Sequence, residues 1–253
     1  MKSLVIFAYF ERGFSKKNLS FFIKKGLIKS KNIDFLFIIN GPKLSIAIPN
    51  YSNVYVQFRE NRGGDFAAWA YGLSTVRYND YDYFIFLNDT VRGPFLPRYI
   101  SNRIPWPDLF CSPMIDNNQI KLVGTTKNYM LWGKKDDAPH IQSMTFATDR
   151  TGLDLLIASK IFLLENQDDY EIELKKFRKS YIVKYEVGLS KCILNARYLC
   201  YAHYLADSKT SAHGDIYYEK EYFKSTVNPL EVMFIKTNRI DNNIVKNYTS
   251  WLS

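Results

Sequence analysis

Mostly apolar runs at intervals along the first third of this 253-residue chain constrain its fold most strongly. Leu4–Tyr9, Ile33–Ile39 and Tyr81–Leu87 are three such runs. A strand that is apolar on both faces is typical of a parallel sheet covered by helices on both sides. Asn53–Phe58 alternates between apolar and polar residues, which predicts a further strand between the second and third runs.

Two of the intervals between these strands carry helical patterns. Ser15 can cap a helix whose apolar residues continue at helical spacing to Leu27. From Asp65, apolar residues recur at helical spacing as far as Val76. The order β-α-β-β-α-β predicts an α/β fold with a mostly parallel, doubly wound sheet. Such a sheet binds ligands in a crevice at the carboxyl ends of its strands.

The remainder of the chain is less regular. Residues 92–150 are richer in Pro and Gly, and we predict short strands there at Leu109–Met114 and Gln142–Thr148. From Thr151 to about Tyr198 the pattern is helical. No internal repeat and no Pro-, Ser- or Gly-rich linker divides the sequence, so we expect a single domain over residues 1–253.

Charge and cysteine content limit the partners and the location. The chain has 34 Lys and Arg against 25 Asp and Glu, a net charge of +9, which fits a partner that carries phosphate. The basic residues are dispersed, so we expect no nucleic-acid binding. The apolar runs are too short to span a bilayer, so we expect at most peripheral membrane contact. Three cysteines without a C-x-x-C pair favour a reducing, cytoplasmic location.

The motif Asn61-Arg62-Gly63-Gly64-Asp65 lies between a predicted strand and a predicted helix. Gly63 and Gly64 let the backbone approach a ligand closely, and a helix N-terminus favours negative charge. The Asp65 carboxylate can accept hydrogen bonds from ribose hydroxyls or from a base N–H. The alternative is an ordinary turn in which Asp65 is the helix N-cap.

A second polar group, Asn88-Asp89-Thr90, follows the buried strand at Tyr81–Leu87. It therefore lies at the rim where open α/β sheets bind ligands. Strand alternation predicts Asn88 and Thr90 on one face and Asp89 on the other. Arg92 can add positive charge for a phosphate contact. The alternative is a solvated turn after a strand.

Together, these motifs resemble the rhamnan-synthesis protein F family of glycosyltransferases and its relatives in large DNA viruses. The segments that carry the resemblance are Asn61–Asp65, Tyr81–Asp89, Thr90–Phe95, Tyr185–Ser190 and Asn228–Lys236. Their order and spacing extend the resemblance over about 4–240.

The resemblance implies a GT-A fold, with a nucleotide-binding half at about 1–92 and an acceptor-side half at about 93–253. It implies a UDP- or dTDP-linked sugar donor and a glycan or lipid-linked saccharide acceptor. The family's name suggests rhamnose, although donor identity varies freely on this scaffold.

The resemblance also implies a metal ion. Enzymes of this fold carry an Asp-x-Asp pattern after the corresponding strand, and it holds a divalent cation against the donor diphosphate. That pattern is incomplete here, and we expect Mn²⁺ or Mg²⁺ to bridge Asp89 and the diphosphate. His213 lies in a C-terminal segment that adds a metal ligand in several enzymes of this fold; the alternative is an ordinary loop histidine.

An inverting transferase needs a base that deprotonates the acceptor hydroxyl as it attacks the anomeric carbon. Glu186 is predicted to open a helix, where related enzymes carry their catalytic acidic residue. Asp149, after the predicted strand at Gln142–Thr148, is the second candidate. We prefer Glu186 as the base. The alternatives are a charge that complements the helix dipole for Glu186 and an N-cap for Asp149.

Tyr9 and Phe10, at the end of the first strand, are expected to stack on the base of the nucleotide, although core packing explains them equally well. We therefore predict an inverting glycosyltransferase of the hexosyltransferase type. A catalytically silent protein that binds nucleotide sugars or glycans is the alternative, which the incomplete Asn88-Asp89-Thr90 pattern favours. A nucleotidyltransferase is disfavoured because no Gly-rich loop with Arg or Lys follows the first strand.

Overall fold

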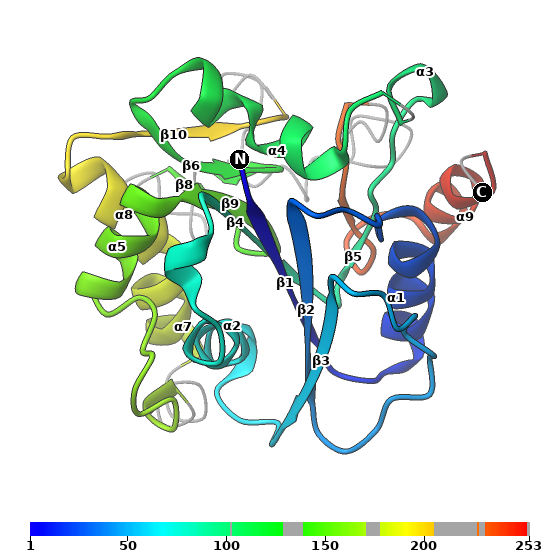
Figure 1. Cartoon of the computed structure of the whole chain (residues 1–253), viewed down its shortest axis with the longest axis horizontal. Helices are drawn as coiled ribbons and strands as arrows, with labels where there is room; N and C mark the ends of the chain where they lie inside the picture. The colour runs from blue at the N-terminus through cyan, green and yellow to red at the C-terminus, as the bar shows by residue number, and fades with distance from the viewer. Residues whose placement is uncertain (102, 129–138, 171–177, 205–226, 228–230, 252–253) are drawn as a thin grey trace.

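The computed structural model describes residues 1–101, 103–128, 139–170, 178–204, 227 and 231–251 (Figure 1). The strands are β1 (Ser3–Tyr9), β2 (Ile33–Asn40), β3 (Val54–Arg59), β4 (Tyr83–Asn88), β5 (Val91–Arg92), β6 (Ile120–Gly124), β7 (Lys127–Asn128), β8 (His140–Ile141), β9 (Thr145–Asp149), β10 (Leu199–Ala202) and β11 (Ile235–Lys236). The helices are α1 (Gly13–Lys25), α2 (Gly64–Ser74), the 3₁₀ helix η1 (Tyr78–Asp80), α3 (Arg98–Ser101), α4 (Trp106–Asp116), α5 (Arg150–Ala158), α7 (Arg178–Tyr181), the π-helical turn η2 (Ile182–Val187), α8 (Gly188–Asn195) and α9 (Asn242–Trp251).

Seven strands form the central sheet, in the order β10-β6-β9-β4-β1-β2-β3. β1 pairs in parallel with β2 and β4, β2 with β3, and β6 with β10. β9 is the exception, because it runs antiparallel to both β4 and β6. The α/β fold with a mostly parallel sheet flanked by helices is therefore confirmed.

The two faces of the sheet are covered by different helices. Successive side chains of a strand point to opposite faces. Accordingly, Val5, Phe7 and Tyr9 of β1 belong to a core that includes α1, α4 and α9. Leu4, Ile6 and Ala8 belong to a second core that includes α2, α5 and α8. Figure 1 shows these two helical layers on either side of the sheet.

Aromatic packing ties α2 to the end of β4. Phe86 stacks on Phe146 and Phe162, with ring centroids 4.8 and 5.0 Å apart, and is completely buried. Trp69 of α2 packs edge-on against Phe86 at 5.8 Å, and its indole N–H donates to the carbonyl of Leu87 at 3.0 Å. This contact positions α2 against the residue that precedes Asn88.

The prediction of a strand at Leu109–Met114 is wrong, because these residues belong to the helix α4. Trp106, Phe110 and Met114 follow one another at intervals of four residues and are all buried, which is helical periodicity. The strand predicted at Gln142–Thr148 exists as β9, which begins three residues later and ends at Asp149.

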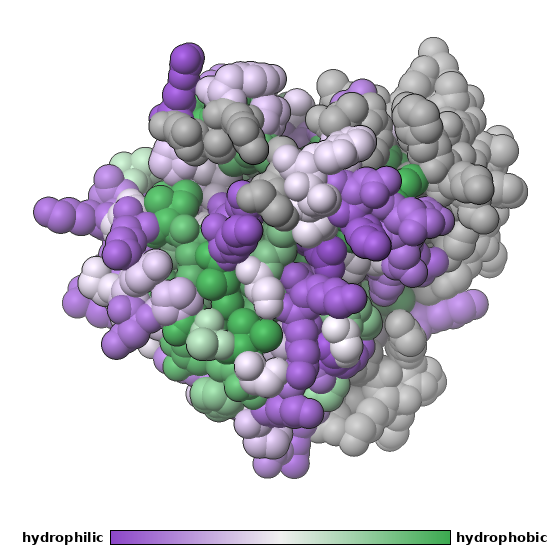
Figure 2. Space-filling model, turned by 90° about the vertical axis from the view of Figure 1, so that its right-hand side faces the viewer, coloured by the Kyte–Doolittle hydropathy of each residue, from purple (hydrophilic) through white to green (hydrophobic). Residues whose placement is uncertain are grey.

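Figure 2 shows the side of the molecule on which α1 and α9 lie. Hydrophilic residues cover much of this face, and hydrophobic residues gather in one area between them. On the α1 side of the sheet, apolar residues of α1 and of the segment 44–51 are partly buried against the core. None of the described helices has the length and apolar character that a membrane span requires.

Phe86→Ala should lower the free energy of unfolding by about 3–5 kcal/mol, because it leaves a cavity between Phe146, Phe162 and Trp69. Phe58→Ala on the edge strand β3 is the matched control, since Phe58 is 52% exposed, and should cost less than about 1 kcal/mol. Urea unfolding of both variants measures the difference. Equal losses in the two variants would contradict the described core.

Candidate functional site

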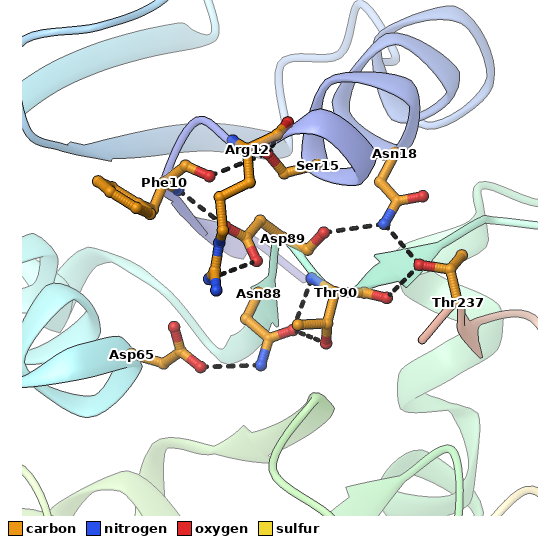
Figure 3. A network of polar contacts seen from close by, with 9 residues as sticks. All are labelled: Phe10, Arg12, Ser15, Asn18, Asp65, Asn88, Asp89, Thr90 and Thr237. Atoms are coloured by element: carbon orange, nitrogen blue, oxygen red, sulfur yellow. Dashed lines mark hydrogen bonds and ion pairs between the residues drawn. The ribbon is translucent and has the colours of Figure 1, made fainter. Parts of the chain in front are cut away.

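The carboxyl ends of β1 and β4 lie side by side at one edge of the sheet, because the two strands are parallel and Ala8 pairs with Asn88. The strand order turns here, with β2 on one side of β1 and β4 on the other. Open α/β sheets form their ligand crevices at such points. Five residues gather at this edge, and we call them the carboxyl-edge cluster: Phe10, Arg12, Asp65, Asn88 and Asp89 (Figure 3).

Asn88 connects β4 to the start of α2. Its side-chain N–H donates to Asp65 Oδ2 at 2.9 Å, and its Oδ1 accepts from the backbone N–H and the hydroxyl of Thr90 at 3.1 and 2.5 Å. Asn88 is 6% exposed. Through this bond the Asn88 amide holds the Asp65 carboxylate at the sheet edge.

The surroundings of Asp65 disfavour the charged form of its carboxyl group. Burial, together with the negative charge of Asp89, raises the pKa of Asp65 to about 6. The hydrogen bond from Asn88 and the charges of Arg12 and Lys236 act in the opposite direction and only partly compensate. Strongly shifted carboxylates in a crevice are typical of functional sites.

Asp89 points away from the Asn88 side chain, as strand alternation predicts. Its Oδ2 accepts the backbone N–H of Phe10 at 3.0 Å, and Arg12 Nη2 lies 3.4 Å from both carboxylate oxygens. Only 3% of the Asp89 side chain is exposed. Burial raises the pKa of Asp89, while Arg12 and the Phe10 N–H oppose that shift.

Arg12 is the functional candidate that the sequence analysis missed. It is the N-cap residue of α1, and its backbone N–H donates to Ser15 Oγ at 2.6 Å. Its guanidinium carbon lies 5.3 Å from the ring centroid of Phe10 and 5.4 Å from that of Phe14. Half of the Arg12 side chain is exposed. The sequence offered only a weak signal for it, a basic residue three positions after the first strand.

Arg92, predicted to contact a donor phosphate, is engaged inside the protein. Its Nε donates to Asn18 Oδ1 and its Nη1 to Thr249 Oγ1, both at 3.0 Å. The Asn18 amide donates in turn to the Asp89 carbonyl and to Thr237 Oγ1. Arg92 is 8% exposed, and burial lowers its pKa. Arg92 thus links α1, β5 and α9 behind the carboxyl-edge cluster.

The loop before α2 adopts a backbone conformation that requires its two glycines. Gly63 and Gly64 have φ angles of 66° and 67°, in the left-handed region that favours glycine. The Tyr181 hydroxyl donates to the Gly63 carbonyl at 2.8 Å. Asn61 and Arg62 are exposed, and Arg62 pairs with Glu60 at 2.6 Å. Tyr181 therefore holds the backbone of the loop, while the side chains of Asn61 and Arg62 are exposed to solvent.

Glu186 approaches the same edge from the other half of the chain. Its Oε2 accepts the Ser143 backbone N–H at 3.3 Å and also the Ser143 hydroxyl. The next residue, Met144, accepts the Asn88 backbone N–H through its carbonyl at 3.2 Å. Glu186 is thereby connected through two adjacent residues to the carboxyl-edge cluster, and its side chain is 23% exposed.

The expectation that Glu186 opens a helix is wrong. Glu186 lies in the π-helical turn η2, which follows α7 and continues directly into α8. The backbone at the junction, Val187 and Gly188, is helical. Glu186 therefore does not lie at a helix N-terminus, and its charge does not complement a helix dipole there. Wide π turns inside helices occur frequently at functional sites.

Asp149 lies at the opposite edge of the sheet. Because β9 is antiparallel to β4, Asp149 pairs with Tyr83 at the start of β4. Asp149 caps α5 by accepting the Gly152 N–H at 2.9 Å, and it pairs with Lys121 at 2.5 Å. The N-cap alternative describes these contacts, and Asp149 does not join the carboxyl-edge cluster.

Tyr9 and Phe10 occupy different environments, although both were expected to stack on a base. The Tyr9 side chain is completely buried in the core, so it offers no face to a ligand. Burial raises its pKa to about 12. Phe10 is partly exposed and lies in the carboxyl-edge cluster.

The described residues do not fit the metal site that was expected at Asp89. The Asp89 carboxylate is buried and already bound by Phe10 and Arg12. Within the described part of the chain, no group of three or more His, Cys, Asp and Glu side chains is arranged to hold a metal ion. His213, the second predicted ligand, lies outside the described residues.

No protein-family model matches the sequence, and no curated protein matches it either. Membership of the rhamnan-synthesis protein F family is therefore not shown. Among solved structures, the chain is similar to a glycosyltransferase involved in the glycosylation of the major capsid of PBCV-1. The two are 12% identical with a TM-score of 0.49, over 99% of this chain and 100% of that one.

Two further solved structures are similar to this chain. One is the mannosyltransferase PcManGT from Pyrobaculum calidifontis, in complex with GDP-Man and Mn²⁺, at 10% identity and a TM-score of 0.47, over 79% of this chain and 54% of that one. The other is S. aureus TarS 1–349, at 13% identity and a TM-score of 0.39, over 66% and 53%. With TM-scores below 0.5, these similarities do not indicate an activity for this chain. The description of the fold depends only on the strand order given above.

Asp65→Asn should stabilise the protein increasingly as the pH rises. The folded-state pKa of Asp65, about 6, lies above the ordinary value of 3.8 for this group, so the folded chain binds more protons between these values. Its stability must fall as the pH rises through that window. We expect the variant to gain about 1–3 kcal/mol over the wild type between pH 4 and pH 7. Urea unfolding at several pH values measures this gain, and a difference independent of pH would contradict the assignment.

Proposed function

We propose that this chain is an inverting glycosyltransferase that moves a sugar from a nucleotide-diphosphate donor to a saccharide hydroxyl. One observation carries the proposal: Asp65 and Glu186, from opposite halves of the chain, are connected through Asn88. The Asn88 side chain holds Asp65, and its backbone N–H bonds Met144, the neighbour of the residue that holds Glu186. Donor and acceptor contacts can therefore be made at one edge.

The donor nucleotide would lie along the carboxyl-edge cluster. Asp65 accepts hydrogen bonds from ribose hydroxyls or a base N–H, and the partly exposed Phe10 ring offers a stacking surface. Gly64 allows close approach of the backbone, and the exposed Asn61 and Arg62 precede it in the same loop. A UDP- or dTDP-linked donor is proposed on the basis of the sequence resemblance.

Glu186 would act on the acceptor side. The acceptor hydroxyl oxygen attacks the anomeric carbon while Glu186 takes its proton. The bond between the anomeric carbon and the diphosphate oxygen breaks at the same time, and the nucleoside diphosphate leaves with the electron pair. Attack opposite to the leaving group inverts the anomeric configuration. Ser143, through its N–H and its hydroxyl, holds the carboxylate in place.

The finer assignments rest on the resemblance to the rhamnan-synthesis protein F family. They are transfer of a hexose, with rhamnose as the first sugar to test, and a glycan or lipid-linked saccharide as the acceptor. A divalent metal has no step in this proposal, because the Asp89 carboxylate does not fit the role of its ligand.

A silent binding protein on the same fold is the second candidate, which the buried Asp89 favours. Incubation with UDP- and dTDP-sugars separates the two. A transferase should be stabilised by its donor in a thermal-shift assay and should release nucleoside diphosphate faster when a saccharide acceptor is added. Binding without release would identify the silent protein, and no binding to any nucleotide sugar would contradict both functions.

Glu186→Gln keeps the shape of the side chain but removes the proton acceptor. Turnover should therefore fall by about 10²–10⁴-fold while donor affinity stays nearly unchanged. Asp149→Asn is the matched control, because Asp149 lies at the opposite edge and should be dispensable for turnover. The proposed base is wrong if the first variant keeps its turnover and the second loses it, and a product with retained configuration would exclude single displacement.

A further inference from the structure

Two positive charges act on the Asp65 carboxylate, beside which the donor nucleotide is proposed to bind. Arg12 extends from the end of β1 towards the Asp65–Asn88 pair, and its charge acts on Asp65 (Figure 3). Lys236 of β11 pairs with Val91 of β5, and its charge also acts on Asp65. The following residue, Thr237, is fixed by donating to the Thr90 carbonyl through its backbone N–H and its hydroxyl, both at 3.0 Å.

The Arg12 guanidinium is held in position, and only part of its hydrogen-bonding capacity is occupied. Asp89 engages Nη2 alone, at 3.4 Å, and two aromatic rings lie against the group. Among the described residues, Nε and Nη1 of Arg12 have no hydrogen-bond partner, and half of the side chain is exposed. A guanidinium with free N–H groups in a fixed plane is suited to bind phosphate oxygens in pairs.

Asp89 is positioned to orient Arg12 rather than to hold a cation. Only 3% of its side chain is exposed, and the Phe10 N–H and Arg12 occupy its oxygens. The position at which the resemblance implies a metal-binding carboxylate thus carries a buried anchor for an arginine. Held by this anchor, Arg12 brings a positive charge to the carboxyl edge.

We propose that Arg12 binds the phosphate groups of the nucleotide donor directly, so that the nucleoside diphosphate binds without a divalent metal. This inference rests on the proposed function. It assigns Arg12 a role as a diphosphate-binding residue and Asp89 a role as the residue that positions it.

Calorimetric titration of the whole chain with UDP and dTDP, in EDTA and in Mn²⁺, tests the inference. The affinity for the nucleotide that binds should be the same in both buffers within about threefold. Arg12→Ala should weaken that affinity by about 10–100-fold, the scale of lost charge-assisted hydrogen bonds, while leaving the affinity for the unphosphorylated nucleoside unchanged. Arg12→Lys should lie between the wild type and the alanine variant, because lysine keeps the charge without the paired N–H groups.

Arg77→Ala is the matched control. Arg77 lies before η1 and β4, away from the carboxyl edge, and 88% of its side chain is exposed. Its removal should leave nucleotide affinity unchanged, and urea unfolding verifies that each variant is folded. Nucleotide binding that is lost in EDTA and restored by Mn²⁺, or an Arg12→Ala variant that binds like the wild type, overturns this inference and leaves the proposed function standing. Failure of UDP, dTDP and every nucleotide sugar to bind in either buffer overturns the proposed function itself.

Discussion

The antiparallel direction of β9 determines which acidic residues lie at the same edge of the sheet. Backbone hydrogen bonds to β4 and β6 fix Thr145 opposite Leu87 and Asp149 opposite Tyr83. The residues just before β9 therefore lie at the carboxyl edge of the parallel strands, and the residues at its end lie at the other edge. Ser143 reaches Glu186 for this reason. If β9 ran in the opposite direction, Ser143 would lie at the other edge of the sheet, and the connection from Glu186 to Asn88 and Asp65 would be lost.

The first half of the fold could be predicted from the sequence because its signals are local. β1, β2 and β4 are buried on both faces, so their composition alone identifies them as strands. The prediction of a strand in place of α4 is wrong because the region is rich in Pro, and α4 itself contains Pro113. The buried residues of α4 nevertheless keep a helical spacing. Nothing local distinguishes a reversed strand from a parallel one, so the direction of β9 required the three-dimensional structure.

The same distinction explains the predictions about the site. Asp65 follows β3 and Asn88 ends β4, two strands of the parallel part of the sheet, so their meeting at one edge could be expected. Arg92 makes contacts with Asn18 and with Thr249, 157 residues away, and no local pattern encodes such a partner. Asp149 was misplaced because its edge depends on strand direction. Arg12 was overlooked because its significance comes from the buried Asp89 and from two aromatic rings, which only packing reveals.

The π turn η2 has a consequence for which changes the chain can accept. Tyr181 precedes η2 and Ser190 follows it, and they are held by the Gly63 carbonyl and the Ile141 N–H, both at 2.8 Å. An α-helix turns by about 100° per residue, and a π turn takes up one extra residue. Inserting or deleting a single residue between these two anchors would rotate one of them away from its partner, together with Glu186. A change of length in this segment would therefore displace several contacts at once, whereas a substitution changes one side chain.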